Sequence, residues 1–580
     1  MVRGIKYHKV VIFFIFLLFA SQIFSKDIWA QNEVDISIDP LIIKNEDFAQ
    51  LLGGFLSTRA NIDPASKNLL SQPQIIEEAK KMFPQPPEFP RPAVMRTHNF
   101  AYGDDYFALT KEEIEDIIKF CSLAGCDPML GAFGEGPVMT INGITGNIMD
   151  FSPEAIRKTA IFAKEKCQYY FGDNQHCLHW NIGNEPPSPA YHCQNYGASL
   201  IPSAIRTIRE VFPNAVFHTP ELYSDMAKVR DSDITIGECI AKTLQENAPD
   251  LKIEVFTTHW YPYICTDGPL NITAVDLLKW NGNGGPIYQK MTYPYDIVNG
   301  MSRWLINYLP TKNSVIGIGE VNPMAACTSQ TDPTSRLNLT WGGAFWHLDV
   351  LGIMAEAGIN YSQKHVHVSF SGGRYAAMIF SQGRIIKNPP YFAYRFYSQY
   401  FGRKIIKSTS SLPQYLNSHA ALDKDGNIRL ALINKTQSSQ KARVNISNFQ
   451  AENLGTSYTM KAPKDFGESP ADFNENTVYS VSQNIPLGNN FEYTIEPYTS
   501  VILKIPGKIK YDNCPSKKSG NLDCSLDGKI NLTDLNILLS SWSPQEIALM
   551  PLTSQRGVDI NDDVKVDEKD LTVLLKNWRP

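Results

Sequence analysis

The chain has 580 residues, of which 43% are hydrophobic, and a formal net charge of -5. This composition excludes global disorder because enough apolar side chain is present for a large core, and the length favours about three or four domains. The small net charge gives no reason to expect nucleic acid or an anionic membrane surface as a partner.

The N-terminal segment is typical of a secretory signal. Three basic residues precede the apolar run Val10–Ala20, which is too short to span a bilayer comfortably. Cleavage after Ser25 or after Ala30 fits the small-residue requirement equally well. We therefore assign residues 1–30 to a signal peptide and expect a secreted, extracellular protein with no stable membrane span after cleavage. Export permits disulfides among the 10 cysteines, whose pairing the sequence leaves open.

Strand-like and helix-like segments alternate from about residue 50 to residue 370. Two helix starts are clear, a capping box at Thr110 and Glu113 and a Ser152-Pro153 pair. The expected buried strands are Leu51–Phe55, Ala93–Arg96, Pro128–Ala132, Leu178–Ile182, Ala215–His218, Ile253–Thr257, Val315–Ile318 and Gly358–Ser362. Such an alternation favours a (β/α)8 TIM barrel, which we place at residues 31–400. An open doubly wound sheet is the alternative, but no Gly-rich phosphate fingerprint follows the first strand.

Polar side chains follow most of these strands, and in a barrel these strand ends share one face, where active sites lie. Two of the residues are glutamates at the ends of separate strands, Glu185 in the stretch Trp180–Pro186 and Glu320. A retaining glycosidase needs such a pair about 5 Å apart, one as acid and base and the other as nucleophile. Glu221 and Glu135, also at strand ends, are the rivals. The structural alternative for Glu185 is a capping or ion-paired carboxylate, and Gly-Glu as at Glu320 recurs in many loops.

The sequence Trp-Asn-Ile-Gly-Asn-Glu-Pro, with Glu320 farther along, resembles clan A of the retaining glycoside hydrolases over roughly residues 45–400. The resemblance implies that Glu185 is the acid/base, that Asn184 binds the sugar 2-hydroxyl and that Glu320 is the nucleophile. It further implies that Tyr261 contacts the nucleophile, that Arg96 supports it and that His259 lies in the substrate site. Clan members often carry Trp at the end of strand eight, where this chain has Asn360–Gln363. Families 39, 51, 30 and 79 combine such a barrel with a sandwich.

The pattern of apolar and polar residues changes after residue 400. Short alternating runs between Asn417 and Asn448 and between Thr477 and Lys504 indicate an antiparallel β-sandwich at residues 401–505, to which Val34–Ile38 could add a strand. Residues 506–522 contain Pro, Gly, Lys and Ser and are typical of a linker.

The last segment, residues 523–580, contains a duplicated motif rich in oxygen-bearing side chains, which suit calcium. The expected calcium ligands are Asp523, Ser525, Asp527, Asn531 and Asp534 in the first copy and Asp559, Asn561, Asp563, Asp567 and Asp570 in the second. Each copy runs into a Leu-Leu-x-x-Trp helix, and the pair resembles a small α-helical type I dockerin. The resemblance implies structural Ca2+ and a cohesin-type scaffold protein as a partner. Val564 replaces the usual Gly at position six of the second loop.

These patterns predict a secreted retaining glycoside hydrolase that acts on a polysaccharide or oligosaccharide by double displacement and needs no cofactor for catalysis. The alternative from another class is a non-catalytic carbohydrate-binding or scaffold-attached module. For the C-terminal segment, the alternative is a calcium-stabilised cap without a partner. The sugar, the linkage and the choice between exo and endo action depend on loops that one sequence does not decode.

Overall fold

The computed structural model describes residues 33–57, 69–98, 107–141, 144–183, 196–219, 234–264, 274–279, 294–309, 314–325, 333–370, 375–462 and 477–510. The predicted signal peptide, residues 511–522 of the predicted linker and the dockerin-like segment at 523–580 lie outside these residues.

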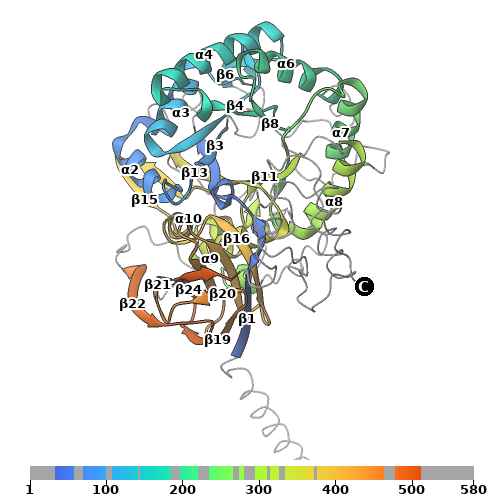
Figure 1. Cartoon of the computed structure of the whole chain (residues 1–580). Helices are drawn as coiled ribbons and strands as arrows, with labels where there is room; N and C mark the ends of the chain where they lie inside the picture. The colour runs from blue at the N-terminus through green and yellow to red at the C-terminus, as the bar shows by residue number, and fades with distance from the viewer. Residues whose placement is uncertain are drawn as a thin grey trace, which may run out of the picture.

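Eight parallel strands form a closed barrel, seen nearly end-on in Figure 1. Closure is completed by the eighth strand, which pairs in parallel with both the first and the seventh. This ring confirms the predicted barrel and is incompatible with the open-sheet alternative. In ring order the strands are β2 (Gly53–Ser57), β3 (Ala93–His98), β4 (Cys126–Gly131), β7 (His179–Asn181), β8 (Val216–His218), β9 (Val255–Trp260), β11 (Val315–Val321) and β13 (Tyr361–Phe370).

Helices surround the ring, and both predicted helix starts are confirmed. The hydroxyl of Thr110 accepts from the Glu113 amide while the Glu113 side chain accepts from the Thr110 amide, and Ser152 caps the next helix with Pro153 in its first turn. The helices are α2 (Pro73–Met82), α3 (Lys111–Ala124), α4 (Pro153–Phe171), α6 (Ile201–Val211), α7 (Ile236–Asn247), α8 (Pro294–Tyr308), α9 (Trp341–Ala357) and α10 (Pro389–Tyr400).

The eighth strand differs from its prediction. Gly358, the expected first residue of the strand, instead ends helix α9 with a left-handed φ of 95°, a conformation that glycine adopts without steric cost. The strand β13 begins at Tyr361 and continues to Phe370. Asn360–Gln363 therefore surrounds the start of the strand, not its C-terminal end, and the prediction that this stretch forms the rim was wrong.

A second sheet of nine strands lies beside the barrel (Figure 1). Its order is β22 (Tyr479–Pro486), β21 (Leu454–Lys461), β24 (Thr499–Ile505), β18 (Ile428–Asn434), β17 (Leu416–Leu422), β16 (Lys404–Ser410), β1 (Glu33–Asn45), β19 (Gln440–Ile446) and β23 (Asn490–Ile495). Strand β1 confirms the extra strand expected at Val34–Ile38. It pairs antiparallel with β16 but parallel with β19, so the sheet is mostly, not purely, antiparallel.

Two sequence-based boundaries need adjustment at this sheet. Residues 33–45, assigned to the barrel segment that starts at 31, form β1 of the second sheet. Residues 507–509, assigned to the linker, form β25, which pairs with β20 (Phe449–Ala451). The remaining short strands are β5 (Gly134–Ile141) with β6 (Ile144–Asp150), β10 (Tyr263–Ile264) with β12 (Met324–Ala325), and β14 (Met378–Ser381) with β15 (Arg384–Lys387).

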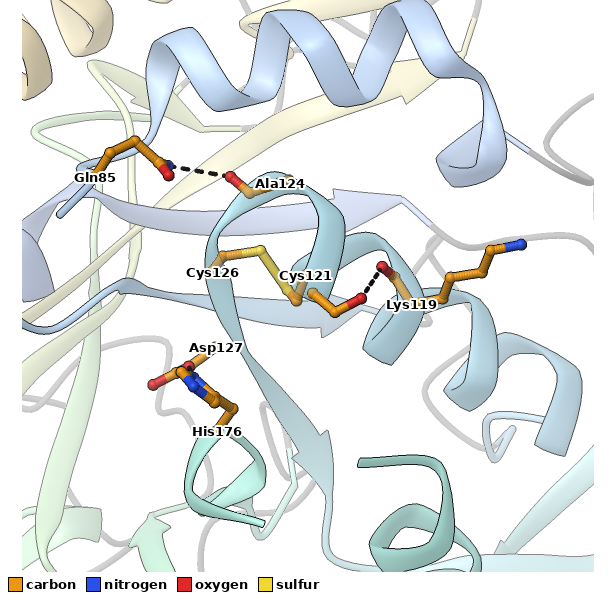
Figure 2. Close-up of a disulfide and its surroundings, with 8 residues drawn as sticks. Gln85, Lys119, Cys121, Ala124, Cys126, Asp127 and His176 are labelled. Carbon is orange, nitrogen blue, oxygen red and sulfur yellow. Dashed lines mark hydrogen bonds and ion pairs between the residues drawn. A yellow bond between two sulfur atoms is a disulfide. The ribbon is translucent and has the colours of Figure 1, made fainter. Parts of the chain in front are cut away.

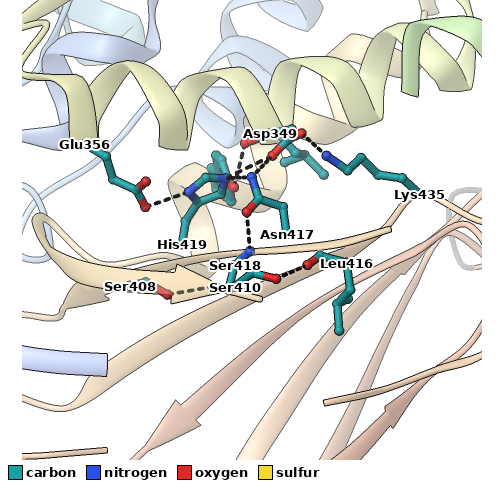
Figure 3. A network of polar contacts seen from close by, with 11 residues as sticks. Asp349, Glu356, Ser408, Ser410, Leu416, Asn417, Ser418, His419 and Lys435 are labelled. Atoms are coloured by element: carbon teal, nitrogen blue, oxygen red, sulfur yellow. Dashed lines mark hydrogen bonds and ion pairs between the residues drawn. The ribbon is translucent and has the colours of Figure 1, made fainter. Parts of the chain in front are cut away.

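Helix α9 forms the junction between the barrel and the sheet. Its residues from Trp341 to Ala355 are all buried, because the barrel covers one side and strands of the second sheet cover another. The helix is accordingly apolar around its whole circumference, with few polar exceptions. One exception, Asp349, faces the sheet and accepts hydrogen bonds from Asn417, His419 and Lys435 (Figure 3). The junction is therefore fixed by both packing and buried charge.

Disulfides fasten two helices of the barrel. Cys121 near the end of α3 is bonded to Cys126 at the start of β4 (Figure 2), and Cys167 of α4 is bonded to Cys177 just before β7. Cys239 is disulfide-bonded as well. The first bond joins the end of a helix to the strand that follows it, and the second joins a helix to the short turn before the next strand. Among the residues that the structure describes, no helix has the length and apolar character needed to cross a membrane.

Candidate active site

Glu320 lies near the C-terminal end of β11, at the face of the barrel where the predicted site residues were expected. Six of the seven residues of this strand are buried, and Glu320 itself is 6% exposed. The register of β11 against β9 shifts between Ile318 and Glu320. Irregularities of this kind re-aim a side chain, and they are common beside active sites.

Two groups from the end of β9 contact one oxygen of this carboxylate. The hydroxyl of Tyr261 donates a hydrogen bond to Glu320 Oε2. The ring of His259 lies on the same side, with its Nδ1 3.5 Å from Oε2. Both side chains are buried, so solvent does not compete for these positions.

Arg96 of β3 lies near the other oxygen of the Glu320 carboxylate. Its Nη1 lies 4.0 Å from Glu320 Oε1 and donates to the carbonyl oxygen of Gly319 at 3.4 Å. The guanidinium carbon lies 4.5 Å from the centroid of the Phe55 ring, and the side chain is only 1% exposed. A buried cation and a hydroxyl donor together stabilise negative charge on Glu320. The structure thus brings Glu320, Arg96, His259 and Tyr261 together.

The other half of the predicted pair, Asn184 and Glu185, lies outside the described residues, which end at Gly183 on this side. The residues just before them, Trp180 to Gly183, are held by specific contacts. Trp180 is buried against Phe212, and the amide of Gly183 donates to Asn181 Oδ1 at 3.0 Å. Gly183 has a φ of 144°, which residues with a β-carbon rarely adopt, so the motif requires glycine there.

Of the two rival glutamates, only Glu135 lies among the described residues. The carboxylate of Glu135 accepts a hydrogen bond from the Lys111 amide at 2.9 Å, so it caps the first turn of α3. Glu221 lies outside the described residues, as do all ten predicted calcium ligands. Within the segments that the structure covers, no group of three or more His, Cys, Asp and Glu side chains is arranged to hold a metal ion.

Strand β13 contributes residues that the sequence did not indicate. Lys364 pairs in register with Val321, next to Glu320, so Lys364 and His365 lie level with the end of β11, and we call these two residues the rim of β13. The ring of His365 lies 5.1 Å from that of Phe55 and 5.0 Å from that of Tyr375. Burial lowers the pKa of His365 to about 4, although the charge of Glu320 opposes the shift. A neutral histidine therefore lies near the middle of β13, next to the residue that pairs with Val321.

No protein-family model and no curated protein matches the sequence. Solved structures do match the fold. A GH51 arabinofuranosidase from Xanthomonas axonopodis pv. citri aligns with a TM-score of 0.56 and 13% identity, covering 82% of this chain and 100% of that chain. A family 44 xyloglucanase from Paenibacillus polymyxa aligns with a TM-score of 0.57 and 13% identity, covering 82% of this chain and 99% of that chain. CelM2, a bifunctional glucanase-xylanase from a metagenome library, aligns with a TM-score of 0.53 and 14% identity, covering 82% of this chain and 100% of that chain.

This chain has their fold. At such identities the likeness extends to the barrel and the sheet beside it, while any activity must be argued from the site itself.

Proposed function

We propose that the protein is a secreted glycoside hydrolase that cleaves an oligosaccharide or polysaccharide with retention of configuration. The observation that carries the proposal is the convergence of Arg96 and Tyr261 on the buried carboxylate of Glu320. A buried carboxylate that contacts an arginine and a tyrosine hydroxyl at the mouth of a barrel is suited to attack an anomeric carbon. The matched structures are named as glycoside hydrolases, which adds support from the fold.

The proposed reaction has two displacements. Glu320 attacks the anomeric carbon while Glu185 gives its proton to the departing glycosidic oxygen, and the sugar becomes bonded to Glu320. Glu185 then takes a proton from water, and the water oxygen replaces Glu320 at the same carbon. Asn184 holds the sugar 2-hydroxyl through both steps. The residues provide every proton and electron pair required, so no cofactor is part of the proposal.

The test is Glu320→Gly with azide. The variant should lose at least about a thousandfold in kcat on an aryl glycoside, and azide, which fits the space left by the carboxylate, should restore turnover and yield a glycosyl azide. Glu135→Gln is the matched control, because this carboxylate caps a helix, and it should keep kcat within about twofold. Undiminished turnover by Glu320→Gly would show that another group is the nucleophile. A binding-only module would turn over no aryl glycoside at all.

Export is proposed from the signal-like segment at 1–30 and is supported by the disulfides, which persist in oxidising compartments. We further propose that residues 523–580 bind structural Ca2+ and attach the enzyme to a cohesin-type scaffold protein. Calorimetric titration of the full chain with Ca2+ should show binding that the Asp523→Ala/Asp534→Ala variant lacks at the first loop. Absence of calcium binding by the unaltered chain would remove this attachment proposal.

A further inference from the structure

Lys364 is a fully buried lysine on β13, between β2 and β11. It pairs in register with Gly54 on one side and Val321 on the other. Its Nζ donates to Asn322 Oδ1 at 3.0 Å and to the carbonyl oxygen of Tyr375 at 2.7 Å. Across the described part of the chain, no carboxylate lies within ion-pair distance of it. Burial of an amine without a counter-charge is costly, so the position needs another explanation.

The surroundings of Lys364 suit the uncharged amine. An ammonium group has three N–H donors and an amine has two, and the two acceptors named above satisfy the amine in full. The titratable side chains that face it are His347 of α9 and its strand neighbours His365 and His367, and burial lowers the pKa of each. Burial also lowers the pKa of Lys364 to about 7.

The two acceptors connect Lys364 to both sides of the site. Asn322 is fully buried and follows Glu320 by two residues; its Nδ2 donates to the carbonyl oxygen of His365. Lys364 has only donors, so its bond to Oδ1 fixes which way the Asn322 amide points. Tyr375 begins the described segment after β13 and places its ring against that of His365. One nitrogen therefore joins the end of β11, the rim of β13 and the segment after it.

We propose that Lys364 is a positioning residue of the site: through Asn322 and Tyr375 it holds the end of β11, which carries Glu320, in register with the rim of β13, which carries His365. The inference rests on the proposed function, because it concerns the reaction at Glu320. A displacement of about 1 Å at a nucleophile is enough to slow a reaction about a hundredfold.

The first test is Lys364→Met, which keeps the side-chain length and removes both donors. On the aryl glycoside that the unaltered enzyme cleaves best, kcat should fall about 10- to 100-fold while KM changes less than about threefold, because misplacement of the nucleophile acts on the transition state. Lys435→Met is the matched control. It removes another buried lysine, which is bonded to Asp349 at the junction with the second sheet, and should lower the unfolding midpoint while kcat stays within about twofold. Equal kcat in Lys364→Met and the unaltered enzyme would overturn the inference.

A second variant, Asn322→Ala, removes the shared partner. If Lys364 acts through Asn322, the losses in kcat of the two single variants should not add in the double variant. Fully additive losses would contradict the proposed route.

Amide hydrogen exchange tests the anchoring without any substrate. Peptides covering 315–325 and 361–370 should exchange faster in Lys364→Met than in Lys435→Met. If the unaltered enzyme cleaves no glycoside, the proposed function fails, and exchange still decides whether Lys364 fixes the rim. Unchanged exchange in both peptides would show that it does not.

Discussion

His419 of β17 lies between two carboxylates of α9 (Figure 3). Its Nε2 is 3.1 Å from Asp349 Oδ1, and its Nδ1 is 2.9 Å from Glu356 Oε1. Burial acts to lower the pKa of His419, but the adjacent carboxylates outweigh it and raise the value to about 9. Burial raises the pKa of Glu356, whereas Lys435 and His419 hold that of Asp349 well below its usual range despite burial. The ring is therefore a cation that donates to both helix side chains.

This titration predicts a pH-dependent part of the stability. The pKa of His419 is about 9 in the folded chain and about 6.5 when unfolded, so the stabilisation is complete below pH 6.5 and is lost as the pH rises through 9. A shift of this size corresponds to about 3 kcal/mol. In urea unfolding, the difference between the unaltered chain and His419→Gln should shrink by roughly that amount between pH 6.5 and 9.5.

His218→Gln is the control for this experiment. Burial and the nearby charges of His179 and Arg96 keep the pKa of His218 well below its usual value, so it is neutral throughout this range when folded. Its effect on unfolding should be flat between pH 7.5 and 9.5. A difference for His419→Gln that is equally flat would mean that His419 is not charged in the folded protein.

At the residue scale, the sequence indicated candidate site residues where polar side chains end apolar strands. Arg96, His259, Tyr261 and Glu320 all follow buried runs, and the barrel topology brings such ends together. The partners on strand eight were missed for a physical reason. Lysine is almost never fully buried, so a polar run that contains Lys364 is typical of a loop rather than a core strand. Asn322 was missed because its role depends on a side-chain bond across strands.

At the scale of elements, most strand positions were predictable because parallel strands buried on both faces are continuous apolar runs. Val315–Ile318, for example, lies inside β11. The end of α9 was not predictable in the same way. This helix is buried all round, so its apolar sequence lacks the one-sided period that would separate it from the following strand.

Contacts between elements distant in the chain are also not predicted by a local sequence pattern. Gly352 permits α9 to approach β17, because a β-carbon there would lie 2.2 Å from the His419 ring. The parallel pairing of β1 with β19 joins segments about 400 residues apart. Neither feature leaves a local signal: the alternation at Val34–Ile38 indicated an extra strand of the second sheet, but not its parallel pairing with β19.

At the scale of the whole molecule, the fold places Glu320 and the side chains around it on a closed ring of strands, and the second sheet lies against one side of that ring. The barrel face with Glu320 is formed by strand ends from β3, β9, β11 and β13, while α9 and α10 connect the barrel to the sheet. Disulfides join helix ends to β4 and to the segment before β7. Side chains held by several strands keep their relative positions within the small tolerances that the proposed double displacement requires.

The most direct measurement is identification of the residue that becomes bonded to sugar. A 2-deoxy-2-fluoro aryl glycoside of the sugar that the enzyme cleaves slows release of the covalent intermediate, and mass spectrometry of the digested protein locates the added sugar. We predict one glycosyl group on the peptide that contains Glu320, formed in the unaltered enzyme and absent in Glu320→Gly. A sugar attached to Glu221 or Glu135, or turnover that inverts the anomeric configuration without any attached sugar, would contradict the proposed double displacement at Glu320.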